Sequence, residues 1–137
     1  MNHSATAQIR NAPISPKQCI EIAKYLRRMN TTKAKKVLEE TIALKHAIPF
    51  KTFNRDMGHR PGIAAGRYPQ KAAAVFLDLI KSAESNAEDK GLNVEMLQIT
   101  SLLANRAATR PTGGRIRGVP KRAHLKIELT ERAGDKK

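Results

Sequence analysis

The amino-acid sequence predicts an α+β fold in which three helices pack on a small antiparallel sheet and a long β-hairpin protrudes. Three observations predict this fold. The chain has 137 residues, which fits a single domain spanning residues 1–137. Apolar residues recur at helical spacing in three segments of the first two thirds of the chain. The last third instead shows the alternation typical of strands, interrupted by one long basic segment.

Each of the three helical segments has a recognisable start. Ser15-Pro16 suits the N-cap and the first position of the first helix. The break at Asn30-Thr31-Thr32 starts a second helix, which is expected to run to about Lys45, and Pro69 starts a third, expected to run to about Lys90. The residues expected on the buried faces are Cys19, Ile22, Ala23 and Leu26, then Ala34, Val37, Leu38, Leu44 and either Thr41 or Ile42, then Ala72, Phe76, Leu79, Ile80, Ala83 and Ala87.

Beyond the third helix the chain is expected to be β. Gly91 suits the position that terminates this helix. A strand at Glu95–Ile99 lies within residues 93–103, and His124–Glu131 forms a second strand with Leu125, Ile127 and Leu129 on one face. Near the N-terminus, Gln8-Ile9-Arg10 is a candidate edge strand.

The segment between these two strands, Ala104 to Arg122, is the most unusual part of the chain. It contains six Lys or Arg and no acidic residue, and the stretch Arg110–Arg115 with its Gly-Gly pair has turn chemistry. The segment is either a flexible basic loop or a continuation of the hairpin, and the flanking strands favour the second. An extended arm of this length reaches roughly 30 Å. An isolated ribbon without counter-charges is marginal in water, so a partner is expected to hold it.

A second basic element is expected at residues 46–68. Its Pro and Gly residues are spaced too closely for a helix, and Asp56 is its one acidic residue. We interpret it as a long ordered loop. Loops of this length are uncommon in compact domains unless they have a function or are disordered.

The net charge indicates a polyanionic partner. Lys and Arg number 26 against 12 Asp and Glu, which gives a net charge of +14. Nucleic acid is the usual partner of such a protein, with anionic membrane second. The N-terminus has no apolar run, so neither membrane insertion nor secretion is expected and the protein is predicted to be intracellular. Aromatic residues make up only 4%, which favours recognition of folded RNA or duplex over base stacking.

No group of residues indicates catalysis. The four histidines are not at metal-ligand spacing, and the single cysteine, Cys19, lies on an apolar stripe. Gly58-His59-Arg60-Pro61-Gly62 lacks the lysine and hydroxyl residue of a phosphate-binding P-loop. The protein is therefore predicted not to be an enzyme and to have no cofactor, metal or small-molecule substrate.

Several motifs together resemble the universal large-subunit ribosomal protein family conventionally numbered twenty-two, in its archaeal and eukaryotic form. The resemblance covers about Ile14 to Glu131. The motifs that carry it are Ile14-Ser15-Pro16-Lys17, Ile42-Ala43-Leu44-Lys45, Ile48-Pro49-Phe50, Gly58-His59-Arg60-Pro61-Gly62, Ala65-Gly66-Arg67-Tyr68-Pro69-Gln70-Lys71-Ala72-Ala73, Ser82-Ala83-Glu84-Ser85-Asn86-Ala87-Glu88, Lys90-Gly91-Leu92 and His124-Leu125-Lys126-Ile127-Glu128-Leu129.

This resemblance implies a cytoplasmic, structural component of the large ribosomal subunit that binds its ribosomal RNA and aids subunit assembly. It implies contacts with neighbouring large-subunit proteins. It also implies that the arm extends into the wall of the nascent-peptide exit tunnel, through which the nascent polypeptide passes. The residues expected to bind RNA are Lys17, Lys51, His59, Arg60, Arg67, Tyr68, Lys71, Arg106, Arg110, Arg115, Arg117, Lys121, Arg122 and His124. The expected tunnel-lining tip consists of Arg110, Pro111, Thr112, Gly113, Gly114, Arg115, Ile116 and Arg117.

Two other classes of protein share some of these features. An architectural DNA-binding protein with β-ribbon arms is also basic, and Pro111 could act as its wedge. Such proteins usually dimerise through a large apolar face, which the pattern does not predict here. An RNA-modifying enzyme is disfavoured because the sequence lacks a catalytic cluster and a cofactor loop.

Overall fold

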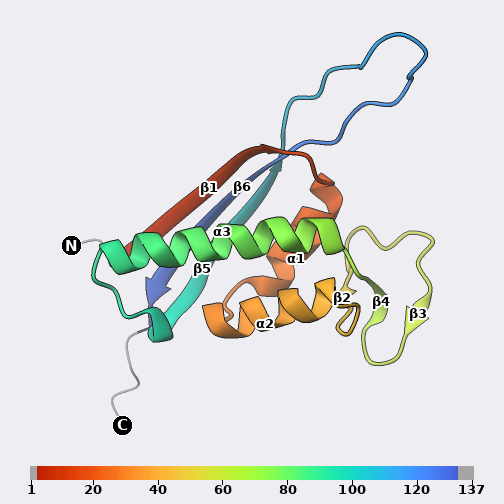
Figure 1. Cartoon of the computed structure of the whole chain (residues 1–137). Coiled ribbons are helices and arrows are strands. Elements are labelled where there is room, and N and C mark those ends of the chain that lie inside the picture. The colour runs from red at the N-terminus through yellow and green to blue at the C-terminus, as the bar shows by residue number, and fades with distance from the viewer. Residues whose placement is uncertain (1–2, 133–137) are drawn as a thin grey trace.

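The computed structural model describes residues 3–132 and shows an α+β arrangement with two small antiparallel sheets (Figure 1). The elements in chain order are β1 (Ser4–Ala12), α1 (Pro16–Leu26), α2 (Thr31–Ile42), β2 (Ile48–Pro49), β3 (His59–Arg60), β4 (Ala64–Arg67), α3 (Gln70–Asp89), a 3₁₀ turn η1 (Val94–Met96), β5 (Leu97–Arg106) and β6 (Ala123–Glu131). This confirms the predicted fold class of three helices with a small antiparallel sheet.

The larger sheet has the strand order β1-β6-β5, so the last strand in the chain lies at its centre. Helix α3 packs against β1 and β6, α1 packs against β5, and α2 packs on α3. The predicted alternation of β6 is confirmed, because Leu125, Ile127 and Leu129 are buried beneath these helices. All apolar stripe residues predicted for the first and third helices are buried as well.

Both edges of this sheet are partly covered. At the β5 edge, the N–H of Arg28 donates to the carbonyl of Ile99 and the N–H of Ile99 donates to Met29, each at 2.9 Å. At the β1 edge, the side chain of Asn86 in α3 donates to the carbonyl of Thr6 at 2.9 Å. The side chain of Lys90, just after that helix, donates to the carbonyl of Ser4 at 2.8 Å. These contacts pair backbone groups near the start of β1 and near the start of β5, which shortens the edge open to another chain.

The helix ends differ partly from the prediction. Helix α2 ends at Ile42 rather than near Lys45, and Leu44, predicted to be buried, is 55% exposed with a φ of 60°. The left-handed backbone turns its side chain away from the helical stripe, so the periodicity no longer applies there. The end of α3 matches the prediction. Gly91 has a φ of 73°, and the N–H of Leu92 donates to the carbonyl of Ala87 at 3.0 Å, which is the Schellman arrangement.

Strand boundaries also shift. The N-terminal edge strand is confirmed, but it covers all of Ser4–Ala12 rather than three residues. Glu95 and Met96 lie in the 3₁₀ turn rather than in a strand, because the side chain of Asn93 caps that turn by accepting from the N–H of Glu95 at 3.1 Å. Glu84 of α3 is buried, although a carboxylate is usually exposed on a helix, and it pairs with Lys35 of α2 at 2.8 Å. Its burial follows from the packing of α2 on α3.

The basic loop 46–68 contains regular structure that the pattern did not predict. Strand β4 pairs with β2 on one side and with β3 on the other, forming a three-stranded sheet of very short strands. Ile48 and Phe50 are buried and join this sheet to the main core. The prediction of a long ordered loop without strands is therefore wrong in this respect. Strands of two residues fall below the length at which alternation can be recognised.

Gly66 in β4 allows the two outer strands to approach. A Cβ at this position would lie 3.2 Å from the backbone oxygen of Ile48 and 2.5 Å from a side-chain methyl of Ile63. We therefore expect Gly66→Val to lower the free energy of unfolding by about 1–3 kcal/mol, measured by urea denaturation. Gly58→Val is the matched control, because no atom lies within 4 Å of its Cβ position. Equal losses in the two variants would contradict the packing role.

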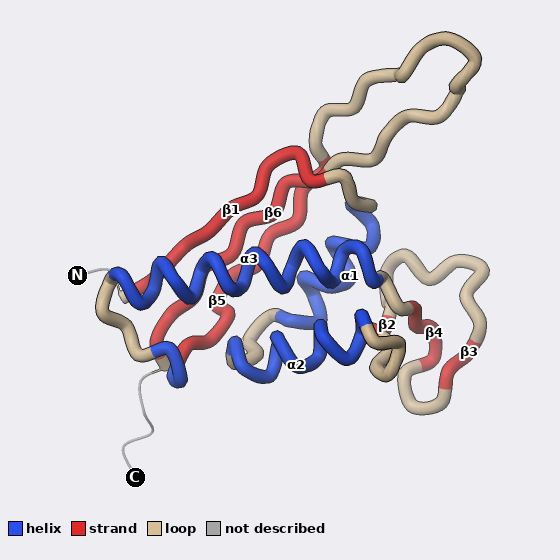
Figure 2. Tube along the Cα trace, viewed as in Figure 1, coloured by secondary structure: helices blue, strands red, loops and turns tan. Residues whose placement is uncertain are grey.

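The predicted long β-hairpin is not confirmed as a paired ribbon. The ladder between β5 and β6 ends at the pair Arg106 and Ala123, followed by one bond from the N–H of Ala107 to Arg122 at 3.1 Å. Residues 111–120 are all exposed, and Figure 2 shows the segment leaving the sheet as a long unpaired loop. The predicted turn is present, since Gly113 and Gly114 have φ values of 72° and 63°. Proline cannot donate to a ladder, and the uncompensated cations repel one another, which accounts for the missing pairing.

Candidate nucleic-acid interface

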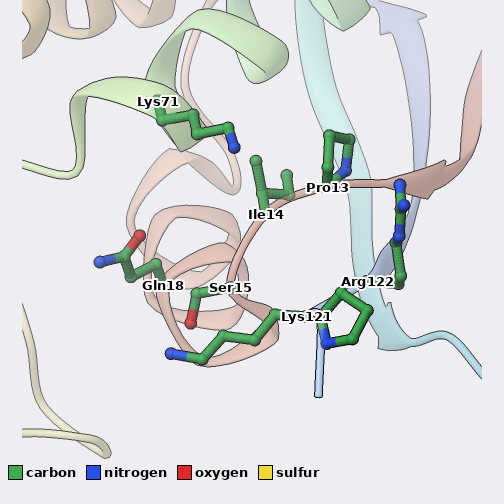
Figure 3. A pocket seen from close by; sticks show the side chains of 8 residues that line it. Pro13, Ile14, Ser15, Gln18, Lys71, Lys121 and Arg122 are labelled. Carbon is green, nitrogen blue, oxygen red and sulfur yellow. The ribbon is translucent and has the colours of Figure 1, made fainter. Parts of the chain in front are cut away.

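A pocket of about 430 Å³ lies where the protruding loop, residues 107–122, meets the body (Figure 3). Its walls come from three parts of the chain: the segment that leads into α1, the first turn of α3, and the end of the loop. The residues that line it are Pro13, Ile14, Ser15, Gln18, Lys71, Pro120, Lys121 and Arg122. Three of these side chains are basic and none is acidic, so the pocket is electropositive.

A second hollow of about 340 Å³ shares Lys121 and Arg122 with the first and adds Lys17 and Arg106. We call the five basic residues of the two hollows the arm root: Lys17, Lys71, Arg106, Lys121 and Arg122. The N-terminus of α1 lies in the same place, and its first turn carries no acidic residue and no side-chain cap from Ser15. The helix dipole therefore adds to the positive field of these side chains.

The predicted tip residues extend away from the arm root into solvent. Pro111 to Arg117 are all exposed, and Ile116 is 67% exposed despite being apolar. None of Arg110, Arg115 and Arg117 contacts a carboxylate in the described part of the chain. Their guanidinium groups are therefore available to an external anion.

The basic loop 46–68 presents its predicted residues in two ways. Lys51, His59 and Arg67 are exposed. Arg60 and Tyr68 instead contact each other: the guanidinium carbon lies 4.8 Å from the ring centroid, and Nε donates to the carbonyl of Gly66 at 2.9 Å. This stacking holds the cation of Arg60 at a defined position on the loop.

His124 and Arg122 brace the backbone beside the protruding loop. The Nδ1 atom of His124 accepts from the N–H of Asn11 at 3.1 Å, and the guanidinium of Arg122 donates to the carbonyl of Asn11 at 3.3 Å. Asn11 has a φ of 55° and lies where the pairing of β1 with β6 is irregular. These two predicted RNA-binding residues therefore have a structural contact that the sequence pattern did not predict.

The two basic elements project from the same end of the body. Figure 1 shows the protruding loop and the loop 46–68 at the end where α3 begins, whereas the chain termini lie at the opposite end. Lys71, at the start of α3, faces the pocket at the arm root, as Figure 3 shows. The fold thus gathers cations from distant parts of the sequence on one side.

Glu21 of α1 is a structural residue of this region that sequence reasoning missed. Its side chain is 1% exposed, and its carboxylate accepts from the N–H groups of Lys51, Thr52 and Phe53 at 3.0, 2.8 and 3.0 Å. Burial by itself raises the pKa of this carboxyl, but the three N–H donors together with nearby Lys24 outweigh it and lower the pKa below the ordinary value. No short-range pattern indicates this contact.

Among the residues that the structure describes, neither the cysteine nor the metal-ligating residue types form a further candidate site. Cys19 is buried, as the apolar stripe predicted, and burial raises the pKa of its thiol to about 12. Within residues 3–132, no cluster of His, Cys, Asp and Glu could hold a metal ion. No helix in that range is both long and apolar enough to cross a bilayer.

Comparison with known proteins identifies the family. The profile described as Ribosomal protein L22p/L17e matches residues 7–128. The chain belongs to this family. It is thus a large-subunit ribosomal protein of the family numbered twenty-two, and not an enzyme, as the motifs indicated.

Archaeal relatives agree with this assignment. Each of the following is called large ribosomal subunit protein uL22. The protein of Methanoculleus marisnigri is 49% identical over 104 residues, which cover 74% of this chain and 68% of the relative. That of Thermoplasma volcanium is 43% identical over 104 residues, covering 76% and 70%. That of Ignicoccus hospitalis is 36% identical over 140 residues, covering 93% and 88%.

Proposed function

We propose that this protein, acting as one domain, binds large-subunit ribosomal RNA through the arm root, the protruding loop and the loop 46–68. The observation that supports this most directly is the convergence of five cations from α1, α3, β5 and the end of the protruding loop on two hollows without an acidic wall. Phosphate groups are the anions that such arginine and lysine clusters bind in RNA. The chain belongs to a ribosomal protein family, and its relatives are named as proteins of the large ribosomal subunit, so the RNA of that subunit is the expected partner.

We further propose that the protruding loop, residues 107–122, lies along the wall of the nascent-peptide exit tunnel. Its charge, its exposure and its lack of pairing support this, because such a segment requires an RNA surface to hold its shape. Binding of several RNA segments at once would also aid assembly of the subunit. Neighbouring large-subunit proteins and the passing nascent chain are the expected protein contacts.

A single crosslinker at the tip tests this placement. Since the thiol of Cys19 is buried and protonated, Ile116→Cys can be labelled selectively with a photoactivatable probe. In intact large subunits we expect crosslinks from Ile116→Cys to ribosomal RNA, and in translating ribosomes crosslinks to the nascent chain as well. Lys81→Cys on the exposed face of α3 is the control and should not reach the nascent chain. Equal nascent-chain yields from both positions would contradict the tunnel placement.

The architectural DNA-binding alternative is tested on the free protein. Our proposal expects preferential binding to large-subunit RNA over duplex DNA of equal charge, by a monomer. A stable dimer that bends duplex DNA would support the alternative instead.

A further inference from the structure

Two carboxylates of this chain, Glu21 and Glu84, are buried, and Glu84 pairs with Lys35. Glu21 instead accepts its hydrogen bonds from the backbone N–H groups of three consecutive residues, Lys51, Thr52 and Phe53. Successive N–H groups that point to one place form a concavity that binds anions. Here an internal side chain occupies that concavity.

We propose that Glu21 is a positioning residue for RNA binding, which holds the start of the basic loop in its RNA-binding shape before RNA arrives. This inference rests on the proposed RNA-binding role of the loop 46–68. The carboxylate itself need not touch RNA, because it is buried beneath the residues that it orders.

The neighbours of Glu21 on α1 act on the same segment. At 3.6 residues per turn, Lys17, Glu21, Lys24 and Tyr25 share the helix face opposite the core stripe of Cys19, Ile22, Ala23 and Leu26. The ammonium of Lys17 lies 5.7 Å from the ring centroid of Phe53, and that of Lys24 donates to the hydroxyl of Thr52. The hydroxyl of Tyr25 lies 3.0 Å from Nε2 of His46. This face of α1 is thus a platform for the first part of the loop.

We call the three hydrogen bonds from the N–H groups of residues 51–53 to Glu21 the clamp. It bears on RNA binding because cations of the loop lie on or next to the clamped residues. Lys51 donates its N–H to Glu21 while its side chain is exposed, and Arg55, two residues after the clamp, is exposed as well. Ordering a few free residues at the moment of binding lowers affinity, whereas a segment ordered beforehand avoids that loss.

The positioning role and simple electrostatics predict opposite effects of Glu21→Gln on RNA affinity. Glu21→Gln removes one negative charge, so charge alone would tighten RNA binding. An amide accepts backbone N–H groups only through its oxygen, so the positioning role predicts weaker binding, by about tenfold at fixed salt. Glu39→Gln is the matched control, since Glu39 is exposed on α2 and the same charge is removed. This control should bind RNA as well as the parent chain or better.

Nuclear magnetic resonance of the free, full-length chain can measure directly whether the N–H groups of residues 51–53 are bonded to Glu21. We expect the amide resonances of residues 51–53 to move upfield and lose exchange protection in Glu21→Gln and Glu21→Ala, while amides of the buried strand β6 stay unchanged. In the parent chain those three amides should follow one titration. The pKa of Glu21 is lowered in the folded protein, so the clamp is intact above the ordinary carboxyl range and opens as the pH falls through the lowered value.

Rescue by a small carboxylate separates positioning from general destabilisation. Glu21→Ala lacks the carboxylate. Sodium formate should restore the protection of amides 51–53 and part of the RNA affinity in this variant, whereas sodium chloride at equal ionic strength should not. Unchanged amides and unchanged affinity in both Glu21 variants would overturn the proposal. If the parent chain failed to bind ribosomal RNA, the proposed function would fail, whereas the amide and formate measurements would still show whether Glu21 orders the loop.

Discussion

Replacing three cations of the arm root, Lys71, Arg106 and Lys121, with alanine is expected to weaken binding to large-subunit RNA about a hundredfold or more near 0.1 M salt. Each phosphate contact contributes about 0.7–0.9 to the slope of log affinity against log salt, which corresponds to about five- to eightfold in affinity at that salt concentration. All three side chains are exposed at the two hollows. The slope itself should therefore decrease by about 2–3 in magnitude.

The same number of charges can be removed elsewhere as a control. Lys33 and Lys36 of α2 and Lys81 of α3 are exposed and lie outside the residues of both hollows. Replacing these three with alanine changes the net charge equally, so it measures the effect of overall charge alone. We expect a much smaller loss of affinity and of slope. If both triple variants weakened RNA binding equally, the arm root would have no special role.

The largest effect on stability is expected from Phe76→Ala, with a loss of about 3–5 kcal/mol in the free energy of unfolding. Phe76 is fully buried on α3, in the core formed by the three helices and the larger sheet. Truncation removes most of a fully buried side chain and leaves a cavity among its packed neighbours. Urea denaturation followed by circular dichroism measures the loss, which is a large fraction of the stability of an ordinary domain.

Phe53→Ala is the matched control for that variant. Phe53 is half-buried on the loop 46–68, and its ring lies against the ammonium of Lys17. Its truncation should cost about 1 kcal/mol or less. Comparable losses at the two positions would show that the loop and the helices form one equally rigid core, contrary to the packing described above.

The sequence predicted the parts of the fold that depend on neighbouring residues. Spacings of three and four residues placed the buried faces of α1 and α3, and alternation placed Leu125, Ile127 and Leu129. The Schellman end of α3 also followed from one glycine. Where the local backbone changed, at Leu44, the extrapolated periodicity was wrong.

In the candidate site, too, some features could be predicted from the sequence and others could not. The acid-free composition of the protruding loop and the basic character of the loop 46–68 could be predicted, because they are properties of contiguous segments. The contact of Arg60 with Tyr68 and the clamp of Glu21 on residues 51–53 could not. In the second case the partners are separated by about 30 positions.

By itself, the sequence determined the fold class, the family and the two basic segments, because periodicity, motifs and charge are carried by residues close together in the chain. The tertiary structure alone decided that β6 lies at the centre of the sheet, that Lys71 meets Lys121 and Arg122 around one pocket, and that Glu21 orders the start of the loop. It also showed that strand pairing ends at Arg106 and Ala123. The physical reason is that hydrogen bonds and electrostatic fields act over a few ångströms in space, and only packing brings distant residues that close.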